Sequence, residues 1–244
     1  MAFFVARLVM GVCLAASPGE AEESWILLSD DLASWQAPTG QWLIAGGAAM
    51  DPANQRRLTS QPGRGVMING KEGFAENLVS RRQFGDVEVR LEFMVPRRSN
   101  SGVKLQGVYE IQIADTPARD KGPPKGDDCG GIYPRATLGP PYRHIDAGVP
   151  PRVRANKPAG EWQSLEIVFR SPRFDAAGKK TASARFEKVV LNGKLIHENV
   201  EVRYPTGHIW RQKEQPTGPF LLQADHGPVA FRNVRVRPLP APRP

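Results

Sequence analysis

Residues 99–115, SNSGVKLQGVYEIQIAD, alternate apolar and polar side chains with the period of two that is typical of strands buried on one face. Gly107 interrupts the alternation, so two short strands are expected to meet there. The apolar positions that we expect to face a core are Val103, Leu105, Val108, Ile111 and Ile113. An antiparallel hairpin with one buried face is the structure that this pattern favours.

The other face of this predicted hairpin is unusually polar. It carries Lys104, Gln106, Glu110 and Gln112, with Tyr109 beside them. Burying such groups costs free energy unless each finds a hydrogen-bonding partner. The face is therefore either exposed to solvent, as in many antiparallel sheets, or it holds a polyhydroxylated ligand.

Other segments repeat the pattern of short strands. A strand is predicted over 85–95, where Pro96 ends it, and another over 162–170; Asn192-Gly193 predicts a hairpin. No segment has the periodicity of an amphipathic helix of normal length. With 23 Pro and 24 Gly in 244 residues, the chain is expected to form one all-β domain, a sandwich of two antiparallel sheets.

The glycines are interpreted as turns. Residues 41–44 predict a strand that enters a hairpin at Gly46-Gly47, and the glycines between 62 and 80 predict a series of turns. Residues 218–223 and 229–236 are expected to form one further hairpin through Asp225-His226-Gly227.

A long stretch without strand pattern, residues 116–160, is rich in Pro and Gly. Connections of this length inside a compact domain are usually functional or disordered. Because the stretch contains Tyr133, Tyr142 and His144, we expect an ordered loop that covers a ligand.

Charge and targeting limit the possible functions. The formal charge of +8 is spread over scattered arginines rather than a basic stripe, so no nucleic-acid partner is expected. Residues 3–16 form an apolar run too short to span a bilayer comfortably, and small residues follow up to Ala21. We expect a signal peptide over 1–21, with an uncleaved anchor as the alternative. The mature domain, 22–244, would then be periplasmic or secreted, with no transmembrane segment and Cys129 as its only cysteine.

An ordered set of short motifs resembles the 3-keto-disaccharide hydrolase family over about residues 24–238. The motifs are Asn100-Ser101-Gly102, Tyr109-Glu110-Ile111-Gln112 with Asp115, Gly131-Ile132-Tyr133, Gly160-Glu161-Trp162, Leu191-Asn192-Gly193, Leu222-Gln223 with His226-Gly227, and Phe231-Arg232-Asn233-Val234. The chain departs from the family pattern at Gln163, usually Asn, and at Gln106, often Arg. The resemblance implies a concanavalin A-like jelly-roll fold and an oxidised, 3-keto sugar as substrate.

The resemblance also implies a chemistry. A ketone at C3 acidifies the C2 proton, so a base can remove it and the C1 aglycone leaves by β-elimination, after which water adds to the glycal. The protein must supply a base, a cation or hydrogen-bond donor at the enolate oxygen, and often an acid for the leaving group. Ordinary glycoside hydrolysis needs two carboxylates instead.

Residue roles follow from the resemblance. His226 is the first candidate base, because an imidazole titrates near neutrality, and Glu110 is the second. Lys104 is expected to stabilise the enolate. A divalent metal ion held by Glu110, Asp115 and His226 is a possible cofactor, although no ligand spacing in the sequence demonstrates one. The expected substrate-binding residues are Glu92, Lys104, Gln106, Tyr109, Gln112, Tyr133, His144, Trp162 and Gln223. A non-catalytic carbohydrate-binding module is the alternative function, since the same sandwich serves lectins.

Overall fold

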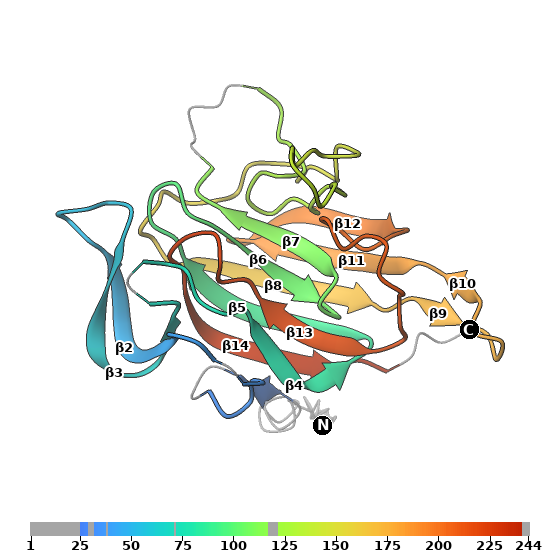
Figure 1. The fold of residues 1–244 in the computed structure, drawn as a ribbon, viewed down its shortest axis with the longest axis horizontal. Helices are drawn as coiled ribbons and strands as arrows, with labels where there is room; N and C mark the ends of the chain where they lie inside the picture. Colours follow the sequence, from blue (N-terminus) through green and yellow to red (C-terminus); the bar gives the residue numbers. More distant parts are fainter. Residues whose placement is uncertain (1–24, 29–31, 38, 71, 117–121, 241–244) are drawn as a thin grey trace, which may run out of the picture.

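Two antiparallel sheets pack face to face in the computed structural model, which describes residues 25–28, 32–37, 39–70, 72–116 and 122–240 (Figure 1). The signal peptide predicted for residues 1–21 lies outside these ranges and stays a prediction. The described residues contain no helix, and therefore none that is long and apolar enough to cross a membrane. The predicted all-β, concanavalin A-like jelly-roll sandwich is confirmed.

The larger sheet has eight strands, and it forms the back layer in Figure 1. From edge to edge it contains β12 (Lys194–Val202), β11 (Ala184–Leu191), β8 (Gln163–Arg170), β5 (Val87–Met94), β14 (Ala230–Pro238), β3 (Leu58–Ile68) and β2 (Leu43–Met50), with β1 (Ile26–Leu27) paired to β14.

The smaller sheet has four strands and lies in front of the larger one (Figure 1). Aromatic rings fill the space between the layers, as where Tyr109 packs on Phe169 with ring centroids 5.4 Å apart. A ribbon of two short strands, β9 (Arg173–Phe174) and β10 (Lys180–Ala182), follows β8. The order of the smaller sheet is β4 (Leu78–Phe84), β13 (Gly218–Leu222), β6 (Asn100–Leu105) and β7 (Tyr109–Ala114).

The hairpin predicted at Gly107 is the pair β6 and β7. Gln106 and Gly107 close it with φ of 54° and 72°, the left-handed conformation that two-residue hairpin turns require. Val103 and Ile111 lie opposite each other and are fully buried. Because side chains alternate across a strand, the next pair, Lys104 and Glu110, points to the outer face of the sheet.

Residues 218–223 and 229–236 do not pair with each other, contrary to the sequence prediction. β13 lies between β4 and β6 in the smaller sheet, whereas β14 lies between β5 and β3 in the larger one. The turn at Asp225-His226-Gly227 therefore carries the chain from one layer to the other. A hairpin turn and a connection between two sheets use the same turn residues, because these residues reverse the chain whether or not the flanking strands pair with each other.

The glycines of β2 and β3 are also not turns. β2 continues through Gly46-Gly47, and β3 continues through Gly63, so the connection between them lies at 51–57. A Cβ at Gly46 would lie 2.5 Å from the carbonyl oxygen of Pro62, and one at Gly63 would lie 2.7 Å from the Gly46 Cα. The glycines permit this close approach of two strands where the register shifts.

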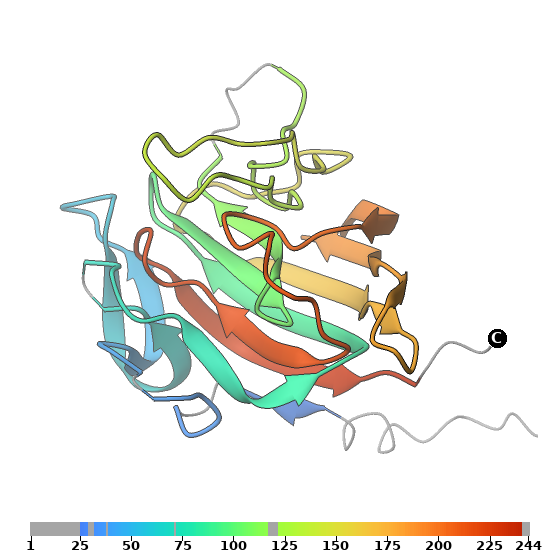
Figure 2. The ribbon, with the colours of Figure 1, turned by 45° about the vertical axis from the view of Figure 1, so that its right-hand side comes forward.

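The described part of the long irregular segment, 122–160, lies above the β7 edge of the smaller sheet in Figure 2. It is joined to that edge by backbone hydrogen bonds: Gln112 N donates to Gly131 O at 2.8 Å, and Tyr133 N donates to Glu110 O at 3.1 Å. These bonds place Tyr133 beside the polar outer face of β7. The segment is irregular as predicted, and its position is fixed by the sheet.

Candidate active site

A cleft of about 480 Å³ lies over the outer face of the smaller sheet. Its floor comes from β6 and β7, one flank from the turn after β13, and the other flank from the long segment next to β7. The residues that line it are Asn77, Asn100, Lys104, Glu110, Gln112, Tyr133, Leu138, Tyr142, Gly207, His208, Gln223, Asp225 and His226. A cleft of this volume is in the range that binds small ligands, roughly 300–1,000 Å³.

An ion pair occupies the floor. Lys104 Nζ lies 3.1 Å from Glu110 Oε2, and the two side chains are only 12% and 5% exposed. The pair is a direct consequence of the hairpin register, in which Lys104 is the cross-strand partner of Glu110. A carboxylate this buried needs the ammonium beside it, so the floor presents a fixed cation to a bound ligand.

Gln112, the next polar residue on the floor, has an unsatisfied acceptor. Its Nε2 donates to Asn100 Oδ1 at 3.2 Å, while its Oε1 is buried without a hydrogen-bond partner. Buried side-chain oxygens in native proteins are nearly always hydrogen-bonded. A hydroxyl group of a ligand in the cleft would supply the missing donor.

His226 forms one flank. Its Nδ1 lies 2.6 Å from Asp225 Oδ1, and the Gln223 amide lies 3.1 Å from the same nitrogen. The hydrogen bond that His226 donates to Asp225 raises the pKa of His226 above its usual value, although burial acts in the opposite direction, and the charge of Glu110 raises the pKa further. Since a carboxylate can only accept, Nδ1 carries the proton in the neutral ring, which leaves Nε2 free to accept one.

Tyr133 forms the opposite flank. The hydroxyl oxygen of Tyr142 lies 3.4 Å from that of Tyr133, and His144 Nε2 lies 3.3 Å from the same Tyr133 oxygen. The His144 ring stands edge-on to the Tyr133 ring, with centroids 5.4 Å apart. Burial raises the pKa of Tyr133 well above its usual value, and its interactions with Tyr142 and with the Glu110 charge act in the same direction.

Seven of the residues singled out in the sequence therefore meet at the cleft: Lys104, Glu110, Gln112, Tyr133, Gln223 and His226 line it, and His144 contacts Tyr133. The sequence prediction omitted Asp225, whose position next to His226 was the available signal. It also omitted Asn100, which has the same strand parity as Lys104. Asn77 and His208 come from distant connections, and no local pattern marks them.

Two predicted binding residues belong to the protein interior instead. Tyr109 has the strand parity of Ile111, so it is fully buried between the sheets, where its hydroxyl donates to Glu214. Gln106 occupies the hairpin turn, and its amide donates to the carbonyl oxygen of Pro216 at 3.1 Å. Neither side chain lines the cleft.

Three further predicted residues lie away from the cleft. Glu92 is on β5 of the larger sheet, where it pairs with Arg232 at 2.6 Å. Trp162 packs its ring against the same guanidinium, 4.1 Å from Cζ to ring centroid. Asp115 accepts a hydrogen bond from the backbone N–H of Arg98 at 2.8 Å. All three side chains make local structural contacts, which sequence spacing cannot distinguish from ligand contacts.

The donor set that the sequence offered for a divalent ion is not assembled. Asp115 is outside the cleft, Glu110 is paired with Lys104, and Nδ1 of His226 is occupied by Asp225. Over the described ranges, no three His, Cys, Asp or Glu side chains come together in a way that could hold a metal ion.

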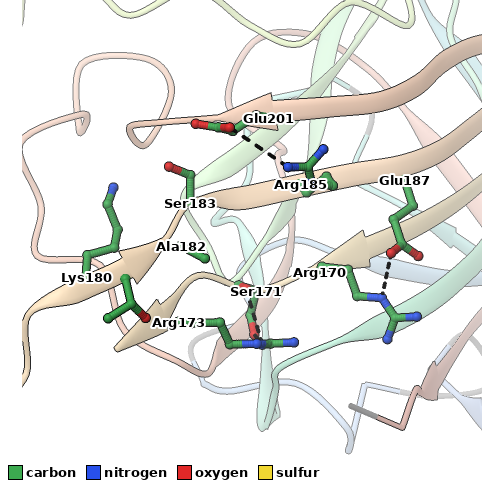
Figure 3. A pocket seen from close by; sticks show the side chains of 10 residues that line it. Arg170, Ser171, Arg173, Lys180, Ala182, Ser183, Arg185, Glu187 and Glu201 are labelled. Atoms are coloured by element: carbon green, nitrogen blue, oxygen red, sulfur yellow. Dashed lines mark hydrogen bonds and ion pairs between the residues drawn. The ribbon is translucent and has the colours of Figure 1, made fainter. Parts of the chain in front are cut away.

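A second cavity of the same size, about 480 Å³, lies at the ends of β8 to β11 and is strongly charged (Figure 3). Its cations already have partners: Arg170 contacts Glu187 at 3.0 Å, and Lys180 contacts Glu214 at 2.5 Å. Arg173 holds Asp86 with two hydrogen bonds of 2.9 and 2.6 Å. Because these cations are paired within the protein, we assign no ligand to this cavity.

The carboxylate of Asp86 bonds to several residues at that charged end of the sandwich, and we expect its removal to destabilise the fold. Besides Arg173, it accepts hydrogen bonds from Ser171 N at 2.9 Å and from Arg170 at 3.1 Å. Burial alone would raise the pKa of Asp86, but the hydrogen bonds from Arg173 and Ser171 outweigh it and lower the pKa. Asp86→Ala should cost about 3 kcal/mol, the low end for breaking a buried ion pair, since both arginines are partly exposed.

Urea unfolding at pH 7 measures this cost. The control is Glu72→Ala, which removes an exposed ion pair with Arg57 and should cost less than about 1 kcal/mol. Because the lowered pKa belongs to the folded state, the contribution of Asp86 is present above its ordinary pKa of 3.8 and is lost as the pH falls through the folded-state value. Equal unfolding midpoints for the two variants at pH 7 would refute the assignment.

Solved structures of other proteins have a similar fold. Two solved proteins from Parabacteroides distasonis ATCC 8503, for each of which glycosyl hydrolase is the suggested activity, are similar to this chain. One is 22% identical, with a TM-score of 0.64 over 96% of this chain and 95% of the other. The second is 15% identical, with a TM-score of 0.52 over 93% and 99%. At these identities the likeness shows the fold alone.

Among curated proteins, none matches this sequence. One family model, described as a 3-keto-alpha-glucoside-1,2-lyase-like domain, matches residues 24–237. This match spans every strand of the sandwich except the last residue of β14 and contains the whole cleft. The chain therefore belongs to the family of 3-keto-α-glucoside-1,2-lyase-like domains, as its sequence motifs predicted.

Proposed function

We propose that this protein cleaves the glycosidic bond of 3-keto-α-glucosides by abstraction of the C2 proton and β-elimination, followed by hydration of the glycal. The observation that carries the proposal is the occurrence, in one cleft, of a histidine whose Nδ1 contacts a carboxylate and of a buried lysine–glutamate pair. Family membership supports the same substrate class.

His226 is the base in this proposal. With its Nδ1 proton directed to Asp225, the imidazole presents an unprotonated Nε2 that accepts the C2 proton. The electron pair of the C2–H bond forms the C2–C3 double bond, and the negative charge moves to the C3 oxygen. Lys104, the cation on the floor, stabilises that oxygen electrostatically.

Glu110, which the sequence offered as a second candidate base, has a different role in this proposal. Its Oε2 already contacts Lys104, and its side chain is almost fully buried, so a carbon-bound proton has little access to it. Its charge keeps the ammonium in place and raises the pKa of His226. We assign it as a positioning residue for Lys104.

When the enolate collapses, the C3 carbonyl re-forms, a double bond forms between C1 and C2, and the C1–O bond breaks. Water then adds to the product, with its oxygen at C1 and its hydrogen at C2, which gives the free 3-keto sugar. These steps need no carboxylate pair flanking the anomeric carbon.

A carbohydrate-binding module is the second candidate, because exposed Tyr142 and unsatisfied Gln112 would also suit a lectin. The test is incubation of the purified protein with methyl 3-keto-α-glucoside and analysis of the products. Released methanol together with glycal or free 3-keto sugar is the expected result. Saturable binding of the intact glycoside, without either product, would overturn the enzymatic proposal.

A further inference from the structure

We propose that Tyr133 is the general acid of this reaction, the group that protonates the glycosidic oxygen as it leaves C1. The inference rests on the proposed elimination and adds to it the one component that His226 and Lys104 do not supply. Tyr142 and His144 are assigned as positioning residues for the phenol.

The order of strands places Tyr133 and His226 on opposite flanks of the cleft. Across the smaller sheet the sequence of elements is β13, β6, β7 and then the segment 130–133, which pairs with the outer edge of β7. His226 follows β13, whereas Tyr133 lies beyond β7. The charge of Glu110, which stands between them on the floor, influences the pKa of both groups.

This separation matches the stereochemistry of an α-linked glucoside. In such a sugar the C2–H bond and the C1–O bond are both axial and point to opposite faces of the ring. A ring that stands between the two flanks therefore presents its C2 proton to His226 and its glycosidic oxygen to Tyr133. One imidazole could not serve both faces, so a second proton-transfer group is needed on the far side.

The hydroxyl of Tyr133 contacts two side chains of its own segment. The hydroxyl oxygen of Tyr142 lies 3.4 Å from the phenol oxygen and His144 Nε2 lies 3.3 Å from it, and the edge-on contact between the His144 and Tyr133 rings fixes the plane of the phenol. Tyr133 lines the cleft, so its phenol can donate its hydrogen to a ligand bound there. Both supporting side chains come from the same long segment as Tyr133, and both are exposed to solvent.

The proton balance closes over the full cycle. During elimination, the C2 proton moves to His226 Nε2 and the Tyr133 proton moves to the departing oxygen, which gives an alcohol, an imidazolium and a phenolate. During hydration, the phenolate removes a proton from the attacking water, and the imidazolium returns its proton to C2. Each group is then restored without an external acid or base.

Burial keeps Tyr133 in the protonated state that this role requires, since it raises the pKa of the phenol well above its usual value. An acid of high pKa transfers its proton only to a strongly basic partner. An alkoxide leaving group is such a partner, whereas nitrophenolate departs without help. The contribution of Tyr133 must therefore depend on the leaving group.

The test compares Tyr133→Phe with the wild-type protein on methyl 3-keto-α-glucoside and on 4-nitrophenyl 3-keto-α-glucoside. We expect kcat for the methyl glycoside to fall on the order of a hundredfold or more, and kcat for the nitrophenyl glycoside to fall less than about tenfold. Tyr142→Phe and His144→Gln should show the same leaving-group dependence with smaller losses, because they act through the position of Tyr133.

Tyr204→Phe is the matched control, because Tyr204 is a half-exposed tyrosine that does not line the cleft. It should leave both activities unchanged. Equal losses on both substrates in Tyr133→Phe, or no loss on either, would overturn the acid assignment while leaving the elimination proposal intact. If the wild-type protein cleaves neither glycoside, the proposed function itself is refuted, so the two failures are distinguishable.

Discussion

Methyl 3-keto-α-glucoside is expected to be cleaved by this protein while methyl α-glucoside remains intact under the same conditions. The reason is the acidity of the C2 proton, which in the keto sugar is adjacent to a carbonyl and in the parent sugar is not. Every pKa unit that separates the carbon acid from the base adds about 1.4 kcal/mol to the free energy of proton transfer. No neutral imidazole can overcome the difference for an unactivated C–H bond.

The measurement is product formation from the two glycosides, followed by mass spectrometry after incubation in deuterated water. The keto sugar product should carry deuterium at C2, because His226 exchanges its proton with solvent before hydration. Comparable cleavage of the unoxidised glucoside would contradict the mechanism. It would instead require a pair of carboxylates at the anomeric centre.

Replacing His226 by Gln is expected to lower kcat for the keto glycoside by about 10²- to 10⁴-fold, the usual effect of losing a positioned proton acceptor. Gln keeps a polar side chain of similar length at the turn, so substrate binding should largely survive. The comparison of kcat with the dissociation constant from calorimetry separates the two effects. An unchanged kcat would exclude His226 as the base.

Asp225→Asn tests the same base through its pH dependence. Since only the neutral imidazole accepts a proton, wild-type activity should decline as the pH falls through the raised pKa of His226, above the ordinary 6.5. Removing the Asp225 charge lowers that pKa, so the acid limb of the rate profile should move to lower pH. If the acid limb of the pH–rate profile is the same in Asp225→Asn and in the wild-type protein, Asp225 does not raise the pKa of the catalytic base.

The sequence by itself determined the local structure of the site floor. The alternation in β6 and β7, with the turn at Gly107, was sufficient to place Lys104, Glu110 and Gln112 on one face, because the direction of side chains on a strand depends only on parity. Parity also explains the failure at Tyr109, which follows the core positions of β7 and not its polar ones. The ordered motifs were sufficient to identify the family.

Only the tertiary structure decided which distant residues meet at that floor. His226 reaches it because β13 inserts between β4 and β6 and not beside β14. Tyr133 reaches it because backbone groups of an irregular segment pair with β7. Strand pairing of this kind depends on hydrogen bonds between residues far apart in the chain. The packing of the whole sandwich determines which of these hydrogen bonds form. Local patterns of hydrophobicity and turn residues carry no information about that choice.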